Sequence, residues 1–379
     1  MPKKGVEKAR EFTFKEKIKN FILVFKERAR SFFWVHPLKK FLIILTSLLF
    51  ILFLLFIIGY FILEKPPEKA LTCSDGTFYE TCSLRKPFFC SDGKLIEKAS
   101  VCGCSKFLTK KDDSCISKYQ NNPKNITLEY ILRGEKDEIN YTVYGGVIDY
   151  LFSLSRHIFY SEEENVFRRD FKLKNINEEI QREMLLPLVI KIQNLAMDKE
   201  DQARIAISLI QNIPYEASEE IFMFEYGQAN QTNSSGYPYD VFYNMNGSCE
   251  EKSNLLAFLL KEIGYGVAIF YYPIENHEVV GIKCPVEYSL NSTGYCFVET
   301  TGPSIISDKG GYYLGWGKLS SEPEVMLISE GDSLGKNLYE YEDAEDWVKI
   351  NGILEEKGKI NIIRHWKLEK LREKYGLIH

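Results

Sequence analysis

The chain has 379 residues, of which 45% are hydrophobic and 27% are charged, and its formal net charge at pH 7 is −5. This length and apolar content allow a sizeable core and more than one domain. The acidic net charge argues against a nucleic-acid-binding protein, so we expect no nucleic-acid partner. The sequence contains no phosphate-binding loop or nucleotide fingerprint. We expect no cofactor and no metal.

The first elements in the chain predict a membrane anchor. Residues 1–40 hold 12 Lys and Arg against 4 Asp and Glu, a net charge of +8, which leaves −13 for the rest of the chain. Residues 41–63 then carry no charge, and 23 helical residues suffice to cross about 30 Å of hydrocarbon. A cleaved signal peptide is the weaker alternative because its apolar run is shorter. The positive-inside rule therefore predicts a single-pass protein of the cell membrane, with a cytoplasmic N-terminus and an extracytoplasmic C-terminal part.

Within the basic segment 1–40, large apolar residues alternate with lysines. The apolar positions are Phe12, Phe14, Ile18, Phe21, Ile22 and Phe25. Two interpretations stay open: a basic amphipathic helix lying on the lipid bilayer, or a solvated tail that only sets the topology.

Six Asn-x-Ser/Thr sequons follow the apolar segment, which agrees weakly with a glycoprotein exposed outside the cell. They begin at Asn125, Asn140, Asn230, Asn233, Asn246 and Asn291. We expect the sequon at Asn246 to be unused because a glycan there would block Cys249.

A cysteine-rich module is predicted over residues 64–116. It holds six of the nine cysteines: Cys73, Cys82, Cys90, Cys102, Cys104 and Cys115. So short a segment needs disulfides to fold, but six cysteines allow 15 pairings and the sequence selects none. A zinc site is the alternative, although the spacing lacks paired Cys-x2-Cys knuckles. The module is interpreted as a spacer or a recognition element.

Residues 117–200 are predicted to be helical. Helices are expected over residues 145–157, which would place His157 on a partly buried helix, and over 177–213, broken or kinked near Pro187 and again near Met197. The polar residues 216–236 are predicted to form a loop, with a covering role as one option.

A free cysteine is predicted at the start of a helix. Leucines and isoleucines recur at helical spacing after Cys249, and Gly264 ends the pattern. Ser248 and Glu251 form a capping-box pair, which places Cys249 at the first helical position. There the helix dipole favours a thiolate, and the backbone N–H groups can stabilise an oxyanion.

Two antiparallel strands are predicted to carry Cys284 and Cys296, joined by a loop that contains Pro285 and Gly294. Cysteines that face each other there can form a disulfide. If they do, and if the six upstream cysteines pair among themselves, Cys249 is the one left over.

Two residues that could act as base and acid, His277 and Glu299, lie on predicted strands after Cys249. An apolar strand comes after the helix, the next strand begins at His277, and a further strand leads to Glu299. A nucleophile needs a base, and the base needs an orienting group. The expected order along the chain is therefore nucleophile, base, acid.

Together these segments resemble the transglutaminase-like superfamily of papain-type cysteine enzymes, in particular its prokaryotic membrane-anchored members. The motifs are Ile213-Pro214-Tyr215, Tyr237-Pro238-Tyr239, Gly247-Ser248-Cys249-Glu250, His277-Glu278-Val279-Val280-Gly281 and Glu299-Thr300-Thr301. They cover roughly residues 200–305.

The resemblance implies Cys249 as the nucleophile, His277 as general base and acid, and Glu299 as the residue that orients the imidazole. Relatives often have Asp in place of Glu299, and Asp in place of Ser248. An oxyanion-hole side chain is not evident; Tyr239 and Asn244 are the candidates, and Tyr239 is preferred. Glu250 and Glu278 are interpreted as capping or solvated residues.

The C-terminal part contains a predicted aromatic loop after Pro303, a strand over residues 324–329, and an amphipathic helix over 360–375. Trp366, Leu368 and Leu371 of that helix are expected to dock on the domain. We assign residues 201–320 to the catalytic domain and 321–379 to an extension.

The predicted fold is α+β, with a helical layer bearing the nucleophile packed on an antiparallel sheet that bears base and acid. The predicted function is a cysteine enzyme that acts on protein or peptide amides through a thioester, first a peptidase. A cross-linking acyltransferase and a non-catalytic surface binding protein are the alternatives.

Overall fold

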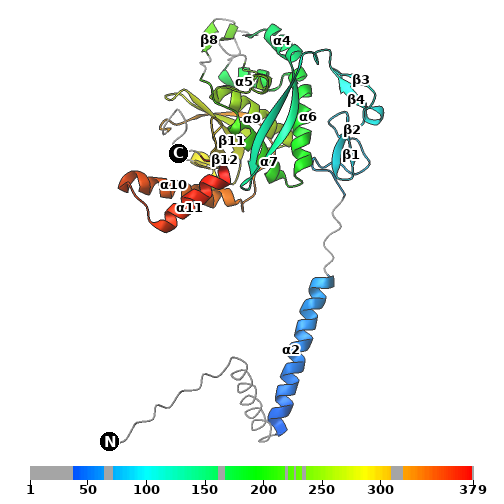
Figure 1. Cartoon of the computed structure of the whole chain (residues 1–379), viewed down its shortest axis with the longest axis vertical. Helices are drawn as coiled ribbons and strands as arrows, with labels where there is room; N and C mark the ends of the chain where they lie inside the picture. Colours follow the sequence, from blue (N-terminus) through cyan, green and yellow to red (C-terminus); the bar gives the residue numbers. More distant parts are fainter. Residues whose placement is uncertain are drawn as a thin grey trace, which may run out of the picture. The chain divides into compact units, whose positions relative to one another are not determined.

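The computed structural model describes residues 37–63, 71–160, 167–217, 221–225, 228–232, 236–308 and 319–377. The chain divides into two compact units, residues 1–70 and 71–379 (Figure 1). The predicted amphipathic pattern of the first 36 residues and most of the aromatic loop after Pro303 lie outside the described residues.

The first unit contains one described helix, α2 (Pro37–Leu63). Among the residues that the structure describes, no helix is both long and apolar enough to cross a membrane. This finding contradicts the predicted transmembrane helix at 41–63 and the localisation in the cell membrane that was based on it.

The second unit begins with the cysteine-rich segment, which consists of small elements tied by disulfides. These are β1 (Phe88–Ser91), β2 (Lys94–Glu97), α3 (Ala99–Cys102), β3 (Thr109–Lys111) and β4 (Ser114–Ile116). The bridges are Cys73–Cys90, Cys82–Cys102 and Cys104–Cys115. The expected disulfide framework is therefore confirmed, and the alternative zinc site loses its thiolate ligands.

The cysteine-rich segment packs on a helix of the main body, α6 (Glu179–Leu195). Buried Phe88 and Leu95 lie in one cluster with Ile190 of α6. The Asn194 side chain bonds both the N–H and the C=O of Leu95, each at 2.9 Å. These contacts make the segment part of the larger unit.

A long hairpin occupies part of the region predicted to be helical, so the prediction for residues 117–200 needs correction. β5 (Pro123–Leu132) pairs with β6 (Glu135–Tyr144) through a two-residue turn at Arg133 and Gly134. Both turn residues have positive φ, at 55° and 88°, as tight hairpin turns of this length require. Alternate residues of both strands are buried, which is the strand period of two.

The helices that follow agree in part with the prediction. α4 (Gly145–Ser153) ends early, and His157 lies exposed at the start of a strand, β7 (His157–Phe159), not on a helix. α6 continues through Pro187, whereas the predicted break near Met197 is confirmed because the Asp198 carboxylate caps the start of α7 (Lys199–Asn212). α5 (Arg168–Ile176) was not predicted.

The predicted loop at 216–236 contains two strands, β8 (Ile221–Glu225) and β9 (Gln228–Thr232). They form a three-stranded sheet in the order β7-β9-β8.

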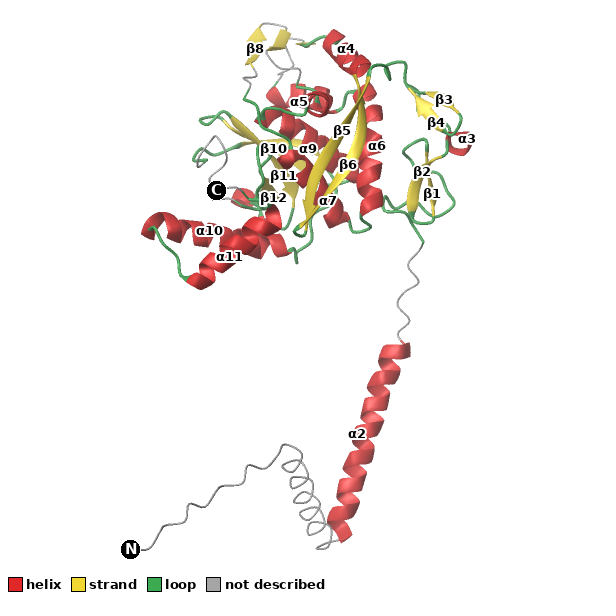
Figure 2. Ribbon diagram, viewed as in Figure 1, coloured by secondary structure: helices red, strands yellow, loops and turns green. Residues whose placement is uncertain are grey.

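The centre of the unit is a four-stranded antiparallel sheet in the order β12-β11-β10-β13 (Figure 2). Its strands are β10 (Val267–Tyr272), β11 (His277–Lys283), β12 (Tyr295–Val298) and β13 (Glu324–Ser329). Two short helices, η1 (Val286–Tyr288) and η2 (Leu290–Ser292), separate β11 from β12. All four strands were predicted.

Helices and the hairpin cover one face of this sheet. α8 (Pro238–Asn244) and α9 (Cys249–Ile263) join α6, α7 and the β5–β6 hairpin in the main core, which includes Leu256, Leu259, Ile269 and Val280. A smaller cluster, with Phe270 and Phe297, lies on the other face. The unit is thus a mixed helix and strand structure in which the start of α9 and the sheet share one core.

Two helices end the chain, α10 (Tyr339–Lys357) and α11 (Ile362–Tyr375). Leu368 and Leu371 are buried as predicted, but Trp366 is 66% exposed, so its predicted docking is wrong. Arg204 of α7 forms a bidentate ion pair with Glu340 at 2.5 and 2.9 Å, which ties α10 to the main body.

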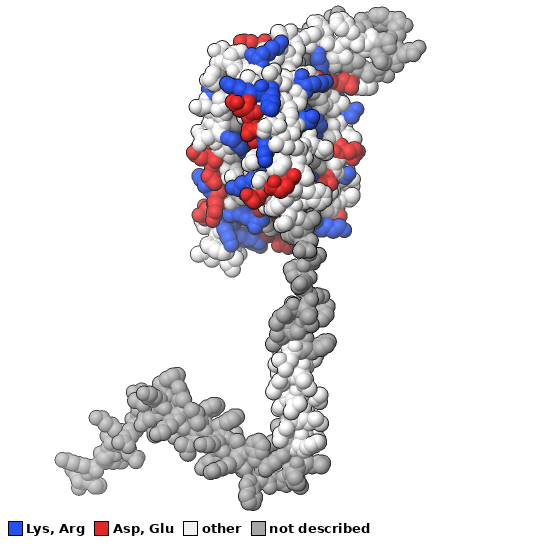
Figure 3. All heavy atoms as spheres, turned by 90° about the vertical axis from the view of Figure 1, so that its right-hand side faces the viewer, with Lys and Arg blue, Asp and Glu red and all other residues white. Residues whose placement is uncertain are grey.

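Basic and acidic side chains are interspersed on the face of the larger unit shown in Figure 3. The net negative charge of the chain is therefore not gathered into a single patch on this face.

Candidate active site

Cys249 is the first residue of α9, as the sequence predicted. The Ser248 hydroxyl accepts a hydrogen bond from the Glu251 N–H at 3.3 Å, and the Glu251 carboxylate accepts one from the Ser248 N–H at 3.1 Å. Gly264 ends the helix with φ of 106°. Cys284 and Cys296 form the fourth disulfide, and Cys249 is the one free cysteine of the nine, all of which lie in described segments.

The turn before Cys249 rests on the Ile213-Pro214-Tyr215 segment at the end of α7. The Gly247 N–H donates to the Pro214 carbonyl at 3.3 Å, and the Glu216 N–H donates to the Gly247 carbonyl at 3.0 Å. A side chain on Gly247 would meet the Cγ2 atom of Val241 at 3.1 Å, so close packing explains the glycine. These contacts fix where α9 begins.

His277 and Glu299 form a buried pair. Continuing the β11–β12 register, in which Val280 faces Val298, places Glu299 diagonally across from His277 on the same face. Nε2 of His277 lies 2.9 Å from Oε2 of Glu299, and the two side chains are 0% and 2% exposed. The pair therefore sits in a medium where its electrostatic interaction is stronger than in water.

The other carboxylate oxygen of Glu299 is held by the two threonines that follow it. Oε1 accepts hydrogen bonds from the N–H groups of Thr300 and Thr301 and from the Thr301 hydroxyl, each at 2.9 Å. Burial alone would raise the pKa of Glu299, but His277 and the Thr301 bonds lower it below the usual value. Glu299 is thus ionised and fixed in orientation, a role for the threonines that the sequence did not reveal.

Contacts through neighbouring residues bring Cys249 to this pair. The backbone of Glu278, the residue after His277, lies near enough to the Cys249 sulfur to lower the pKa of the thiol. One turn further along α9, the Ser253 hydroxyl lies 3.1 Å from the Glu278 carbonyl and 3.1 Å from the Thr300 hydroxyl. The structure therefore gathers Cys249, His277 and Glu299 at one place, and Ser253 is a linking residue that sequence reasoning missed.

The electrostatic environment of Cys249 differs from the expectation. Burial, followed by the charge of Glu250, raises the pKa of the thiol well above its ordinary value, and Glu278 and Glu299 act in the same direction. The helix dipole and the Glu278 backbone oppose them. The resting sulfur is therefore a neutral thiol, and forming the thiolate requires a base.

Two carboxylates beside the site were predicted to be capping or solvated groups, and the structure corrects this. Glu250 and Glu278 are 4% and 0% exposed. Arg168 of α5 bonds Glu250 at 3.3 Å and Glu278 at 3.2 Å, and Lys172 lies 3.0 Å from Glu278. The sequence did not reveal this because the two cations are about 80 to 110 residues away along the chain.

The two candidates for an oxyanion-hole side chain lie on α8. The Tyr239 hydroxyl accepts a hydrogen bond at 2.7 Å from the backbone N–H of Tyr144 at the end of β6. Asn244 is exposed near the end of α8. No described contact joins either residue to Cys249, so the role assigned to Tyr239 stays a prediction, and the backbone N–H of Cys249 is the better-placed donor.

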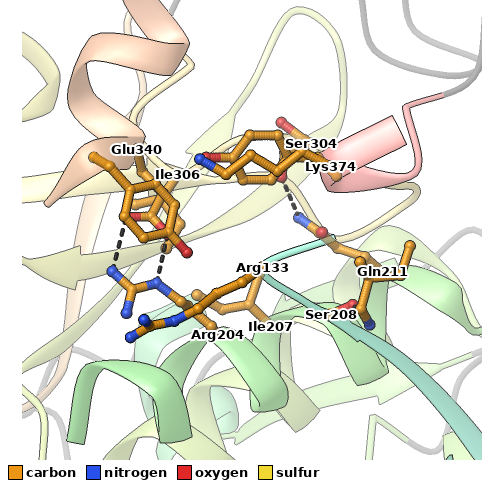
Figure 4. Close-up of a pocket in the computed structure, with 12 residues that line it drawn as sticks. Arg133, Arg204, Ile207, Ser208, Gln211, Ser304, Ile306, Glu340 and Lys374 are labelled. Carbon is orange, nitrogen blue, oxygen red and sulfur yellow. Dashed lines mark hydrogen bonds and ion pairs between the residues drawn. The ribbon is translucent and has the colours of Figure 1, made fainter. Parts of the chain in front are cut away.

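A separate cavity of about 40 Å³ lies between α7 and the C-terminal helices (Figure 4). On its wall, the Gln211 side-chain amide donates to the carbonyls of Glu299 at 2.9 Å and Ser304 at 3.2 Å. The Arg204–Glu340 pair closes the same region. Gln211 therefore holds the backbone of Glu299 and Ser304 in place at the wall of this cavity.

Among the described residues, no three His, Cys, Asp or Glu side chains are grouped so as to hold a metal ion. Comparison of the chain with protein-family models, with curated proteins and with solved structures finds no match.

Proposed function

We propose that the chain is a cysteine enzyme that cleaves protein or peptide amides through a thioester on Cys249, with the fold and the triad of the transglutaminase-like superfamily. The observation that supports the proposal most is the buried His277–Glu299 pair beside a helix that starts with the one unpaired cysteine. A nucleophile, a base and an orienting acid in this arrangement are typical of acyl transfer.

The tautomer of His277 follows from its contact with Glu299. Nε2 faces an ionised carboxylate, so it carries the proton, and Nδ1 has the lone pair that accepts the proton of the Cys249 thiol. The sulfur then attacks the amide carbon, and the carbonyl electrons move to the oxygen, which the Cys249 N–H stabilises.

In the next steps His277 first gives up the proton that it took from Cys249 and then acts as a base again. The C–N bond breaks, His277 gives its proton to the departing amine, and the acyl group stays on sulfur as a thioester. Water then attacks with His277 as base, which releases a carboxylic acid and the free thiol. Hydrolysis is proposed as the reaction because water is the default acceptor.

Access to the sulfur requires a local opening. Cys249 is only 4% exposed and His277 is fully buried. Exclusion of water strengthens the electrostatic interactions between the charges that form during the reaction and the fixed polar groups around them. Substrate binding is therefore coupled to a movement that exposes Cys249.

A peptide-library digest tests the proposal. The unreduced chain is incubated with the library with and without an added primary amine, and products are identified by mass spectrometry, with Cys249→Ser as the inactive control. New carboxyl termini that depend on Cys249 support a peptidase. Amine adducts in their place identify an acyltransferase, and the absence of any product that depends on Cys249 rejects the enzyme in favour of a binding protein.

A further inference from the structure

Lys252 is a fully buried lysine one turn after the candidate nucleophile. It follows Cys249 by three residues on α9, so both side chains lie on the same side of the helix. Its side chain is 0% exposed, and Nζ donates to the carbonyl of Ile213 at 2.6 Å. Its Cγ atom lies 3.3 Å from the position that a Cβ on Gly247 would take, so the stem packs under the turn that precedes Cys249.

A buried ammonium group needs anionic neighbours, since desolvation of an unpaired charge is expensive. The groups that favour the charged form of Lys252 are Glu299 and then Cys249, both members of the proposed triad. Burial is the larger effect and lowers the pKa of Lys252 to about 8, so the side chain is still mainly protonated at pH 7. Among the described residues, a second fully buried lysine, Lys172, instead lies against Glu278.

We propose that Lys252 is a positioning residue of the active site, whose buried positive charge stabilises the thiolate that forms when His277 removes the proton of Cys249. This inference rests on the proposed function, because it assumes that Cys249 reacts as a thiolate. Lys252 acts through Cys249 and Glu299 and touches no substrate.

The charges around Cys249 explain why such a residue is needed. α9 contributes Glu250 and Lys252, β11 contributes His277 and Glu278, and Glu299 follows β12. Arg168 and Lys172 of α5 are engaged with Glu250 and Glu278. The carboxylates of Glu250, Glu278 and Glu299 thus disfavour the thiolate. Lys252 is a cation that interacts electrostatically with Cys249 and Glu299 themselves.

The test is the pH dependence of Cys249 alkylation in the full, unreduced chain. The rate of modification by iodoacetamide is measured between pH 6 and 10 for the wild type, Lys252→Met and Lys252→Gln. Lys252→Gln removes the charge and keeps an N–H donor, on a shorter side chain, for the Ile213 carbonyl. Lys261→Met is the matched control, a lysine later on the same helix that lies beside Asn177 and Glu262.

Both Lys252 variants are expected to raise the pKa of the Cys249 thiol by about one unit, which makes alkylation about tenfold slower at each pH in this range. Lys261→Met is expected to leave the alkylation rate unchanged. A lower melting temperature with an unchanged alkylation rate in Lys252→Met or Lys252→Gln would show a purely structural role and overturn the inference.

The same assay separates this inference from the proposed function. Alkylation that slows in His277→Gln but not in the Lys252 variants leaves the proposed function standing and removes the role of Lys252. Alkylation that is unaffected by His277→Gln removes both.

Discussion

Nε2 of His277 lies 2.9 Å from Oε2 of Glu299, although the two residues are 22 positions apart. The contact depends on the hairpin of β11 and β12, and both side chains are buried. Glu299 therefore controls which nitrogen of His277 carries the proton, and the chemistry of the site follows from this control.

Replacement of Glu299 by Gln should disable the base while keeping its shape. The side-chain amide of the introduced glutamine would donate to Nε2, so the proton would move to Nδ1 and the imidazole could no longer accept the thiol proton. By analogy with a serine triad, we expect peptide cleavage to fall by roughly 10⁴-fold. Glu287→Gln, which removes an equal charge at η1, should keep full activity in the same assay. Activity within threefold of the wild type in Glu299→Gln would contradict the proposed role of this carboxylate.

Loss of the Ser253 hydroxyl should loosen the connection between α9 and the two strands. Ser253→Ala leaves the Glu278 carbonyl and the Thr300 hydroxyl without this buried partner, which costs about 1–3 kcal/mol. We expect a lower free energy of unfolding in urea and slower alkylation of Cys249. Ser289→Ala, a buried serine that bonds the nearby Val286 carbonyl, should reduce stability without slowing alkylation. Equal alkylation rates in both variants would be evidence against the linking role.

The pH dependence of stability should contain a contribution from Asp240 of α8. Burial, and then the charge of Glu251, raise the pKa of this carboxyl to about 7. Because the folded state holds the proton more tightly than the unfolded state, the contribution is fully present below about pH 4 and is lost as the pH rises to about 7. The shift corresponds to about 4 kcal/mol at 1.36 kcal/mol per pKa unit.

Asp240→Asn removes this titration. The difference in unfolding free energy between the variant and the wild type should therefore change in favour of the variant between pH 4 and pH 7, and should be constant above pH 8. Urea denaturation at several pH values measures it. A difference that does not vary with pH would show that folding does not raise the pKa of Asp240.

The Cys284–Cys296 disulfide closes the hairpin that presents His277 and Glu299. Its sequence separation is 12 residues, and the loop-closure model assigns about 3 kcal/mol to a loop of this length. Replacing both cysteines by Ser should lower stability by about this amount and slow the alkylation of Cys249. The control replaces Cys104 and Cys115, with a separation of 11, by Ser in the cysteine-rich segment. The control should cost similar stability with no effect on alkylation. If the control slows alkylation and the loss of Cys284–Cys296 does not, the hairpin disulfide has no role in the site.

Local signals in the sequence were sufficient for the helix and strands that carry the site. Ser248, Glu251 and Gly264 marked both ends of α9, and the strand pattern marked the beginning of β11 at His277. The same kind of signal was present but overlooked in the β5–β6 hairpin, where Ile126, Leu128 and Tyr130 alternate with polar residues before a turn that ends in Gly134.

Other features depend on contacts that no local pattern encodes. α5 is short and highly charged, and its buried Lys172 makes sense only opposite Glu278, more than 100 residues away. The burial of Glu250, Glu278 and Lys252 likewise follows from the meeting of α9 with distant segments. The charge balance around Cys249 could therefore be read only from the folded chain.

Whether His277 is the base for Cys249 can be measured as the rate of Cys249 alkylation by iodoacetamide at pH 7, with and without His277. Mass spectrometry of the unreduced chain identifies Cys249 as the modified residue in the wild type and in His277→Gln. We expect modification of Cys249 alone, at a rate that falls at least tenfold in His277→Gln. Equal rates in the two proteins would contradict the claim that His277 is the base for Cys249.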